Sequence, residues 1–576
     1  MPARILLTGA TGFVGQGLLE RLLADHPGCS VDVLMRSGPQ ESARCRLGNL
    51  LSRGVFGPWR ERVGDAAAAA AVAERVTVLE GSLADLGPLI AQRPPYDVVL
   101  HCAGDVSFDG PIDAAFASNV GGAVSLYEAL REAGTAPHVV HVSTAYVWTD
   151  RVMLALEEPV PHDVPWRREY TSALAQRARR EAEWHADIAS TELVGKAPST
   201  PAQRDRRRGR WVETQLVHDG HDRARELGWT DVYTLTKALG ERVAEELWAD
   251  GPLTILRPTI IESALAQPYE GWIDGFKVAD PLFAAYAKGR LPGFPGLPDA
   301  VVDVVPVDFV VNSILAAAAT PPAAGRTRYL HVGTSTTNPI TMDEIRRHVQ
   351  GYFAECPWVD SAGVTVRPAP WRFSRPGALA AKLRHRQSVL QAVTRLTCHA
   401  PGRRGRALRR RIGDSTRRLS LTHQFVKLYE PYTSSRTCFD DRAGRILAAR
   451  MRELVPARTG SRTHAWDFDA TRIQWGEYWT RVHLPALVDL MLATGGRAQE
   501  CRRRPPAPLE SDLAGVRVVQ RPVAAVVEGL AAAGLALLTD PLRQTPELRQ
   551  TPEFRQTPDR TAPGAPSGRR TTPGSR

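Results

Sequence analysis

A glycine-rich loop near the start of the chain constrains the fold more than any other feature. Residues 8–15 read Thr-Gly-Ala-Thr-Gly-Phe-Val-Gly, directly after the apolar run 5–7 and before a helix-like stretch. Glycines permit a tight turn and let the backbone approach a pyrophosphate, which then lies at a helix N-terminus that favours anions. The loop therefore predicts a dinucleotide site. Its candidate cofactor-binding residues are Thr8, Gly9, Thr11, Gly12, Phe13 and Gly15.

The first 140 residues alternate short apolar runs with amphipathic stretches. Strands are predicted at residues 5–7, 31–35, 76–79, 98–101 and 139–143. Strand-like signals resume at 253–256 and 301–305, and a further segment closes near residue 330. Buried strands that alternate with helices are typical of a parallel sheet covered on both faces. The predicted fold class is therefore α/β, with a doubly wound parallel sheet followed by a mainly helical C-terminal domain.

The pattern divides the chain into three parts. We predict a cofactor-binding domain over residues 1–334, in which an Arg-, Glu- and Ala-rich insertion, 149–230, lies near the substrate site. A helical domain is predicted over 335–500. Residues 501–576 repeat Arg-Gln-Thr-Pro three times and are expected to be disordered after about residue 541, because this composition cannot bury a core.

The positive charge of the chain is concentrated in one segment. The 576 residues carry a formal net charge of +11, which by itself fits a nucleic-acid partner or an anionic surface. Residues 361–420, however, contain 15 lysines and arginines and one acidic residue, Asp414, and the rest of the chain is slightly acidic. This distribution argues against a general nucleic-acid coat, so no nucleic-acid partner is expected.

The cysteines and the apolar segments predict a cytoplasmic protein. The seven cysteines include no Cys-x-x-Cys pair and no neighbouring histidine cluster, which favours a reducing compartment and argues against a structural zinc site. The first residues lead straight into a strand-like run, so no secretion signal is expected. The longest apolar stretch, 523–538, is interrupted by Glu528 and is shorter than the roughly 20 residues that span a bilayer. No metal ligands are predicted.

The end of the second predicted strand favours NADP(H) over NAD(H). A carboxylate about 20 residues after the glycine loop ordinarily holds the ribose 2′-hydroxyl of NAD. Here the strand ends in Met35, Arg36 and Ser37, whereas Asp32 lies inside it. An arginine at this position suits a 2′-phosphate through charge-assisted hydrogen bonds. Arg46 either assists Arg36 or is a solvated helix arginine.

Tyr233 and Lys237 form the sharpest catalytic pattern. A separation of four residues on a helix places the phenol and the ammonium on one face, and the positive charge is expected to lower the Tyr233 pKa. Of the 12 tyrosines, only Tyr233 has a lysine four positions later. Thr144, at the end of a predicted strand, offers a hydroxyl that can hydrogen-bond a substrate carbonyl beside a nicotinamide. The order of glycine loop, Thr144 and Tyr233 favours a catalytic site over a local strand-end cap.

These motifs resemble those of the extended short-chain dehydrogenases/reductases, which have a Rossmann-type sheet, and among them the fatty acyl-CoA reductases of the male-sterility type. The other matching segments are 101–103, 119–122, 143–146, 257–260, 271–274 and 302–308. The 89-residue separation of Thr144 and Tyr233 resembles the long insertion of these reductases, and residues 466–478 resemble the C-terminal domain of alcohol-forming members. The chain has Gly81-Ser82 where the family usually carries Gly-Asp, so the resemblance does not extend to that adenine contact.

The resemblance implies that NADPH reduces a long-chain fatty acyl-CoA to a primary fatty alcohol through a bound aldehyde, with release of CoA. Tyr233 is then the general acid, Thr144 and Tyr233 hydrogen-bond the thioester carbonyl, and Lys237 orients the nicotinamide ribose. Ala103 and Asn119 are implied to lie at the cofactor, although Asn119 fits a structural role equally well.

The sequence leaves other interpretations open. A thioester reductase that stops at the aldehyde resembles the first half of the chain, and a sugar-nucleotide or sterol dehydrogenase can share the fold. A membrane-surface binding protein without activity is a further alternative, but the intact Tyr233–Lys237 pair argues against lost catalysis. The basic segment 361–420 is interpreted either as a site that attracts CoA phosphates, an acyl carrier protein or an anionic membrane, or as a solvated surface. The oligomeric state is not predicted.

Overall fold

The computed structural model describes most of the chain up to residue 493. The described residues are 3–148, 152–192, 200–277, 279–289, 293–360, 363–375, 377–397, 413, 416, 431–454 and 466–493. The predicted tail, 501–576, and the arginine-rich run 403–411 lie outside them. Among the described residues no helix is long and apolar enough to cross a membrane.

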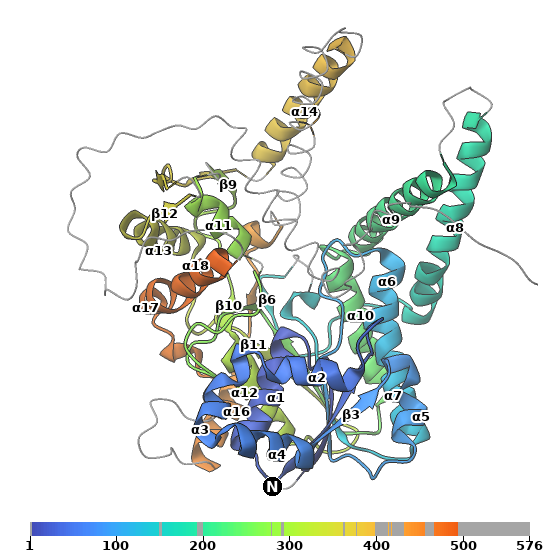
Figure 1. The fold of residues 1–576 in the computed structure, drawn as a ribbon, viewed down its shortest axis with the longest axis vertical. Helices are drawn as coiled ribbons and strands as arrows, with labels where there is room; N and C mark the ends of the chain where they lie inside the picture. Colours follow the sequence, from blue (N-terminus) through green and yellow to red (C-terminus); the bar gives the residue numbers. More distant parts are fainter. Residues whose placement is uncertain are drawn as a thin grey trace, which may run out of the picture.

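A seven-stranded parallel sheet forms the centre of the molecule (Figure 1). In spatial order its strands are β11 (Thr327–Val332), β7 (Leu253–Pro258), β5 (His138–Val142), β4 (Val98–His101), β1 (Ala3–Thr8), β2 (Cys29–Met35) and β3 (Val76–Glu80). The strand order reverses at β1, which pairs with β2 on one side and β4 on the other. Ligands of such sheets bind at the carboxyl ends of the strands, beside the reversal. The predicted doubly wound parallel sheet is confirmed.

Alternate residues of the central strands point into two separate apolar cores. In β1, Ile5 and Leu7 belong to one core and Leu6 to the other, as the two-residue period of a strand requires. Helices α1 (Phe13–Asp25) and α12 (Val307–Ala319) cover the first face of the sheet, and α7 (Gly122–Glu132) and α10 (Val232–Leu247) cover the second. Because both faces are buried, the strands have continuous apolar sequences.

Smaller elements surround the sheet before residue 307. They are α2 (Ala43–Leu51), α3 (Gly57–Val63), α4 (Asp65–Arg75), α5 (Leu86–Ile90), α6 (Ile112–Phe116), β6 (Leu154–Ala155), β8 (Ile260–Glu262), α11 (Asp280–Ala287), β9 (Gly293–Pro295) and β10 (Val304–Pro306). Strands β8 and β10 form a separate parallel pair. This pair leads the chain from β7 to α11 and back to α12.

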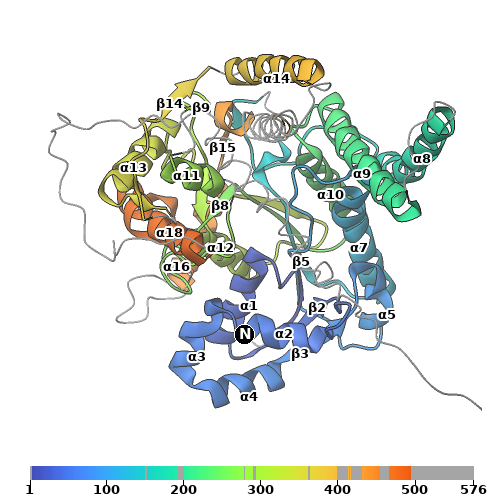
Figure 2. The same ribbon diagram turned by 45° about the horizontal axis from the view of Figure 1, so that its top comes forward.

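Two long helices project from the sheet within the segment 149–230. In Figures 1 and 2, α8 (Trp166–Glu192) and α9 (Pro201–Glu226) run side by side away from the body of the molecule. Helix α9 begins at a capping box in which Thr200 and Gln203 bond each other's backbone amides. Arg223 of α9 pairs with Glu169 of α8 at 2.6 Å, so charged contacts as well as packing hold the two helices together.

Most of the C-terminal elements pack against the first face of the sheet, whereas Phe439 belongs to the core on the second face. The C-terminal elements are α13 (Met342–Glu355), β12 (Trp358–Val359), β13 (Thr365–Val366), β14 (Arg372–Ser374), α14 (Ala378–Thr397), β15 (Cys438–Phe439), α16 (Arg442–Leu454), α17 (Trp475–Glu477), the π-helical turn η6 (Tyr478–His483) and α18 (Leu484–Ala493). Strand β14 pairs with β9 and β15 pairs with β6. Val349 and Trp479 share the core that contains Leu7 of β1, so this core is continuous between the sheet and the C-terminal elements.

Candidate active site

The loop between β1 and α1 has no room for a side chain at two of its glycines. Gly9 has a φ of +75°, and a Cβ there would lie 2.6 Å from the amide nitrogen of Ala103. A Cβ on Gly15 would lie 2.1 Å from the carbonyl oxygen of Gly9. Because such distances are sterically impossible, the turn requires glycine at both positions. Gly12 is exposed at the start of α1, where free helix amides attract a pyrophosphate.

Thr8 connects the end of β1 to the end of β4 beneath this loop. Its hydroxyl shares a 2.9 Å hydrogen bond with Nδ1 of His101 and accepts a 3.2 Å hydrogen bond from the amide of Ala103. Burial lowers the pKa of His101 to about 3, so the imidazole is neutral. These contacts hold Ala103 directly beside the glycine loop.

Thr11 and Phe13 of the glycine loop are held in place by contacts with other parts of the chain. The Gln16 side-chain amide donates to the Thr11 carbonyl oxygen at 3.0 Å and to Asp274 at 2.6 Å. The Phe13 ring lies 4.9 Å from the Trp272 ring, centroid to centroid. The loop is therefore supported by residues more than 250 positions away in the sequence.

Arg36 and Arg46 lie together at the carboxyl end of β2. The Arg46 guanidinium donates to the carbonyl oxygen of Arg36, and the Arg36 side chain is exposed. The Ser37 hydroxyl donates to Glu80, at the end of β3. No local sequence pattern predicted that Glu80 would lie beside the end of β2, because three α-helices separate β2 from β3 in the chain. A pair of arginines at this edge suits a phosphate group.

Helix α10 carries Tyr233 and Lys237 and begins beside the end of β5. Asp231 caps it by accepting a 2.9 Å hydrogen bond from the Thr234 amide. The Lys237 ammonium, 8% exposed, donates to the carbonyl oxygen of Val142 at 2.6 Å. Burial lowers the Lys237 pKa to about 8. The cap and the lysine contact fix the first turns of α10 against the sheet edge.

Tyr233 and Thr144 also meet at this edge. A hydrogen bond from the Thr144 side chain lowers the Tyr233 pKa, but burial is the larger influence and raises it well above the usual value. The expectation that Lys237 lowers the Tyr233 pKa is therefore wrong for this structure: desolvation of the phenolate dominates, and the ammonium is bonded to Val142. The phenol is consequently protonated at neutral pH.

Asn119 links the loop after β4 to α10. It lies in a π-helical turn, Ala117–Gly121, which precedes α7. Its side-chain amide donates to the Thr236 hydroxyl and to the Asp105 carbonyl oxygen, both at 2.9 Å, and its Oδ1 accepts from the Asp105 amide at 2.7 Å. Because the amide is engaged with protein atoms on both sides, these contacts fit the structural interpretation of Asn119.

The sequence patterns missed an aromatic side chain, Tyr432, that reaches this site from the C-terminal part. Its hydroxyl donates to Asp231, the cap of α10. Its ring lies 5.4 Å from Phe108 and 5.2 Å from Tyr146, and Phe108 in turn lies 5.6 Å from Tyr233. Tyr432 is about 200 positions from Tyr233, and no local spacing connects the two.

An apolar cavity of about 40 Å³ has Tyr432 as one of its lining residues. It is lined by Ile260, Ala279, Leu282, Phe283, Val302, Val304, Met342, Ile345, Trp371, Tyr432, Thr433 and Trp479. The lining combines residues that precede β11 with residues of the C-terminal elements. Tyr432 therefore lines the cavity and also contacts Phe108, the ring that packs on Tyr233.

The sheet and the site together define a class of protein. A glycine loop at the reversal of a parallel sheet, with a buried Tyr-Lys pair at the same edge, is the arrangement of a reductase in the extended short-chain dehydrogenase/reductase superfamily, which uses a nicotinamide cofactor. The cradle fits such a cofactor, because the tight turn at Gly9 and Gly15 leaves Gly12 exposed at the start of α1, where a pyrophosphate binds.

Comparisons with known proteins give the family. A family model described as male sterility protein matches residues 7–314. The chain is 29% identical over 501 residues to a probable fatty acyl-CoA reductase 5 of Arabidopsis thaliana. It is 28% identical over 509 residues to an alcohol-forming fatty acyl-CoA reductase of Simmondsia chinensis, and each alignment covers 85% of this chain and 97% of the relative.

Among solved structures, the terminal R domain of the myxalamid PKS-NRPS pathway matches with a TM-score of 0.48 and 15% identity, over 85% of this chain and 91% of that one. The chain belongs to the male sterility family of fatty acyl-CoA reductases, within the extended short-chain dehydrogenases/reductases. The predicted family is confirmed.

Proposed function

We propose that this protein uses NADPH to reduce a long-chain fatty acyl-CoA to a primary fatty alcohol, through a bound aldehyde and with release of CoA. The observation that carries the proposal is the meeting of Thr144, Tyr233 and Lys237 at the sheet edge beside the glycine loop. The similarity to a reductase named as alcohol-forming supports the final product.

NADPH, when bound, supplies one hydride in each of two reductions. In each of them Tyr233 gives its phenolic proton to the oxygen that develops negative charge, and the Thr144 hydroxyl donates a hydrogen bond to that oxygen. The first reduction gives a hemithioacetal, whose hydroxyl loses its proton as the C–S bond breaks; the carbonyl re-forms, and the sulfur takes up a proton and leaves as the CoA thiol. Lys237 keeps one N–H on Val142 and can donate the others to ribose hydroxyls.

A direct test of the substrate class is NADPH oxidation with palmitoyl-CoA, UDP-glucose and a 3-hydroxysterol in parallel. We expect oxidation only with the acyl-CoA. Turnover of the nucleotide sugar or the sterol, with none of the acyl-CoA, would support the alternative dehydrogenases instead.

Arg36 and Arg46 favour NADPH as the cofactor. Arg36→Ala should weaken NADPH binding about tenfold or more and leave NADH binding nearly unchanged, because a hydrogen bond to a charged group contributes about 1.5–3 kcal/mol. Titration of both cofactors by fluorescence measures this. Arg131→Ala, which removes an exposed arginine at the end of α7, is the control. An equal loss for both cofactors would disprove the 2′-phosphate assignment.

We propose that the acyl chain enters the apolar cavity that Tyr432 lines. Val302 lines the cavity, so Val302→Phe should fill it and lower kcat/KM for palmitoyl-CoA about tenfold or more relative to decanoyl-CoA, since one methylene in an apolar pocket contributes about 1–3 kcal/mol. Competition between the two acyl-CoAs gives this ratio. Val364→Phe places the same substitution at a 50% exposed site, and an equal ratio in both variants would contradict the pocket.

The basic segment 361–420 is proposed to attract anionic groups of the substrate or of a membrane that supplies it. In its described part, Lys382 and Arg384 of α14 are exposed. Binding to vesicles that contain anionic lipid should therefore fall steeply as salt rises from 50 to 200 mM, because exposed charges are screened. Vesicle sedimentation measures this, and no retention at either salt concentration would indicate a merely solvated surface.

A further inference from the structure

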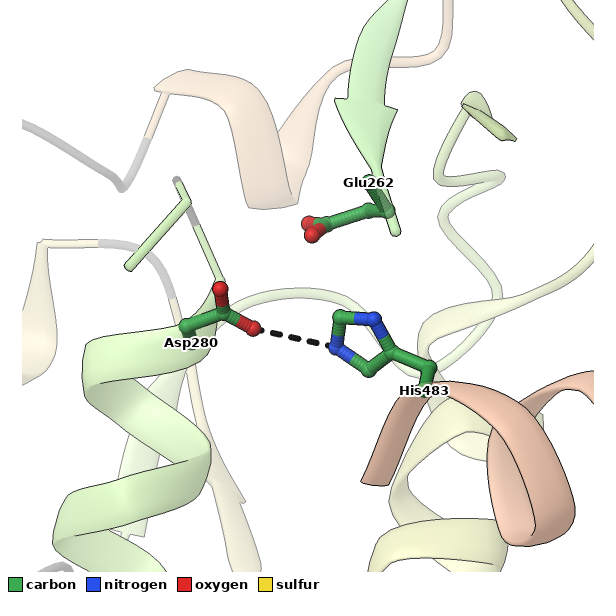
Figure 3. Close-up of side chains that lie close together, drawn as sticks. All are labelled: Glu262, Asp280 and His483. Carbon is green, nitrogen blue, oxygen red and sulfur yellow. Dashed lines mark ion pairs between the residues drawn. The ribbon is translucent and has the colours of Figure 1, made fainter. Parts of the chain in front are cut away.

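Three ionisable side chains meet deep inside the molecule, away from the catalytic residues (Figure 3). Glu262 ends β8, Asp280 begins α11, and His483 ends the π-helical turn η6. Each is 0% exposed. One ligand atom from each residue can be chosen so that all three lie within 4.8 Å of one another. The three residues are separated by 18 and 203 positions, so no sequence spacing predicts their meeting.

Four polar atoms of this cluster have no hydrogen-bond partner. They are both carboxylate oxygens of Glu262, Oδ1 of Asp280 and Nε2 of His483. The last two atoms approach to 3.0 Å as an ion pair, but without the alignment that a hydrogen bond needs. Figure 3 shows the three side chains pointing toward one another. Buried polar atoms are normally satisfied, so four unpartnered ones in one place call for a ligand.

The other polar atoms of Asp280 and His483 are bonded in a way that orients the cluster. The Asp280 Oδ2 accepts from the backbone amide of Lys277 at 2.6 Å. The Nδ1 of His483 shares a 3.1 Å hydrogen bond with the Ser263 hydroxyl. Such outer contacts hold metal-binding histidines and carboxylates in position and leave the opposite atoms free to coordinate.

The charges of the cluster are costly without a counterion. The carboxylates of Glu262 and Asp280 are both fully buried, and a divalent cation between them would balance their charge.

We propose that Glu262, Asp280 and His483 bind a divalent metal ion, with zinc as the best match. Zinc takes four ligands, and carboxylate oxygens and histidine nitrogen are among its usual ones. Bidentate binding by Glu262 would use all four unpartnered atoms. Zinc–ligand distances of about 2.0–2.2 Å place tetrahedral ligands about 3.3–3.5 Å apart, so the Asp280–His483 pair, at 3.0 Å, is already close to that spacing.

The ion would connect three separate parts of the chain. Strand β8 and α11 precede β11, whereas η6 belongs to the C-terminal elements. The neighbouring residues Ile260, Ala279 and Trp479 line the apolar cavity, so the site would fix one wall of that cavity. The ion has a structural role here, because Tyr233, Lys237 and Thr144 take no part in it.

The test is the metal content of the full-length protein. After chelator treatment and reloading with Zn²⁺ alone, gel-filtered protein is analysed by inductively coupled plasma mass spectrometry. We expect about one zinc per chain in the wild type, and a content lower by roughly tenfold or more in Glu262→Gln and His483→Gln. Glu477→Gln changes a 66% exposed carboxylate near the same turn and should keep the wild-type content.

The melting temperature of Glu262→Gln also distinguishes a metal site from a buried glutamic acid that is simply protonated. Glutamine mimics a neutral carboxyl group, so a protonated Glu262 predicts that the variant keeps the wild-type melting temperature whether or not zinc is added. A metal site predicts that zinc raises the melting temperature of the wild type and not of the variant. Wild type that retains no zinc after reloading, or a Glu262→Gln variant that retains as much as wild type, would overturn the proposal. The first outcome decides the question even if the variants do not fold.

Discussion

Tyr233→Phe is expected to lower turnover of acyl-CoA about 10³-fold and to leave NADPH binding nearly unchanged. The substitution removes only the phenolic hydroxyl, which carries the proton that the reduced oxygen needs. The ring remains, so its packing 5.6 Å from Phe108 is preserved. Steady-state kinetics with palmitoyl-CoA and a fluorescence titration of NADPH measure the two quantities separately.

Tyr269→Phe is the matched control, because Tyr269 is 41% exposed and lies outside the site. It should keep near wild-type turnover. If Tyr233→Phe retains turnover within tenfold of the wild type, Tyr233 is not the proton donor. If it loses NADPH binding together with turnover, the tyrosine supports the cofactor rather than the chemistry.

The second large effect is a loss of stability when the buried ion pair between Arg257 and Glu241 of α10 is broken. The Arg257 guanidinium donates to both carboxylate oxygens of Glu241, at 3.0 and 2.7 Å, and to the Glu158 carbonyl oxygen at 2.8 Å. The side chains of Arg257 and Glu241 are 0% and 3% exposed. Arg257→Met would leave the Glu241 carboxylate buried without its charge partner, and should lower the free energy of unfolding by about 3–5 kcal/mol.

Urea denaturation compares this variant with Arg167→Met, which breaks the half-exposed pair between Arg167 and Glu246. The control should cost less than about 1 kcal/mol. Adding Glu241→Leu to Arg257→Met should recover part of the loss, because it removes the unpaired charge. A loss below about 1 kcal/mol in Arg257→Met alone would contradict the importance of this pair for α10, which carries Tyr233 and Lys237.

Much of the fold follows from local sequence signals. The apolar runs predicted six of the seven sheet strands with small shifts at their ends, because strands buried on both faces must be continuously apolar. The segment that closes near residue 330 corresponds to the seventh strand, β11. The glycines at positions 9 and 15 predicted the tight turn between β1 and α1. The pairing of β6 with β15 and of β9 with β14 had no such signal, since each joins two- or three-residue strands far apart in the chain.

Only some residues of the candidate site could likewise be predicted from the sequence. Thr144, Tyr233 and Lys237 could be predicted because each lies at a strand end or at a fixed helical spacing. Tyr432 could not, because it lies 201 positions from Asp231 and still farther along the chain from Phe108. The pKa of Tyr233 was predicted with the wrong sign, since the lysine spacing reveals charge but not burial. The cluster of Glu262, Asp280 and His483 was not predicted either, because the three residues lie far apart in the chain and none stands out in its local sequence.

Alcohol formation is tested by the stoichiometry of the reaction with palmitoyl-CoA. Absorbance gives NADPH oxidised, a thiol reagent gives CoA released, and extraction gives the lipid product. We expect two NADPH oxidised for each CoA released, with hexadecanol as the product. One NADPH for each CoA, with hexadecanal accumulating, would contradict alcohol formation and identify a reductase that stops at the aldehyde. No oxidation with any acyl thioester would contradict the proposed function as a whole.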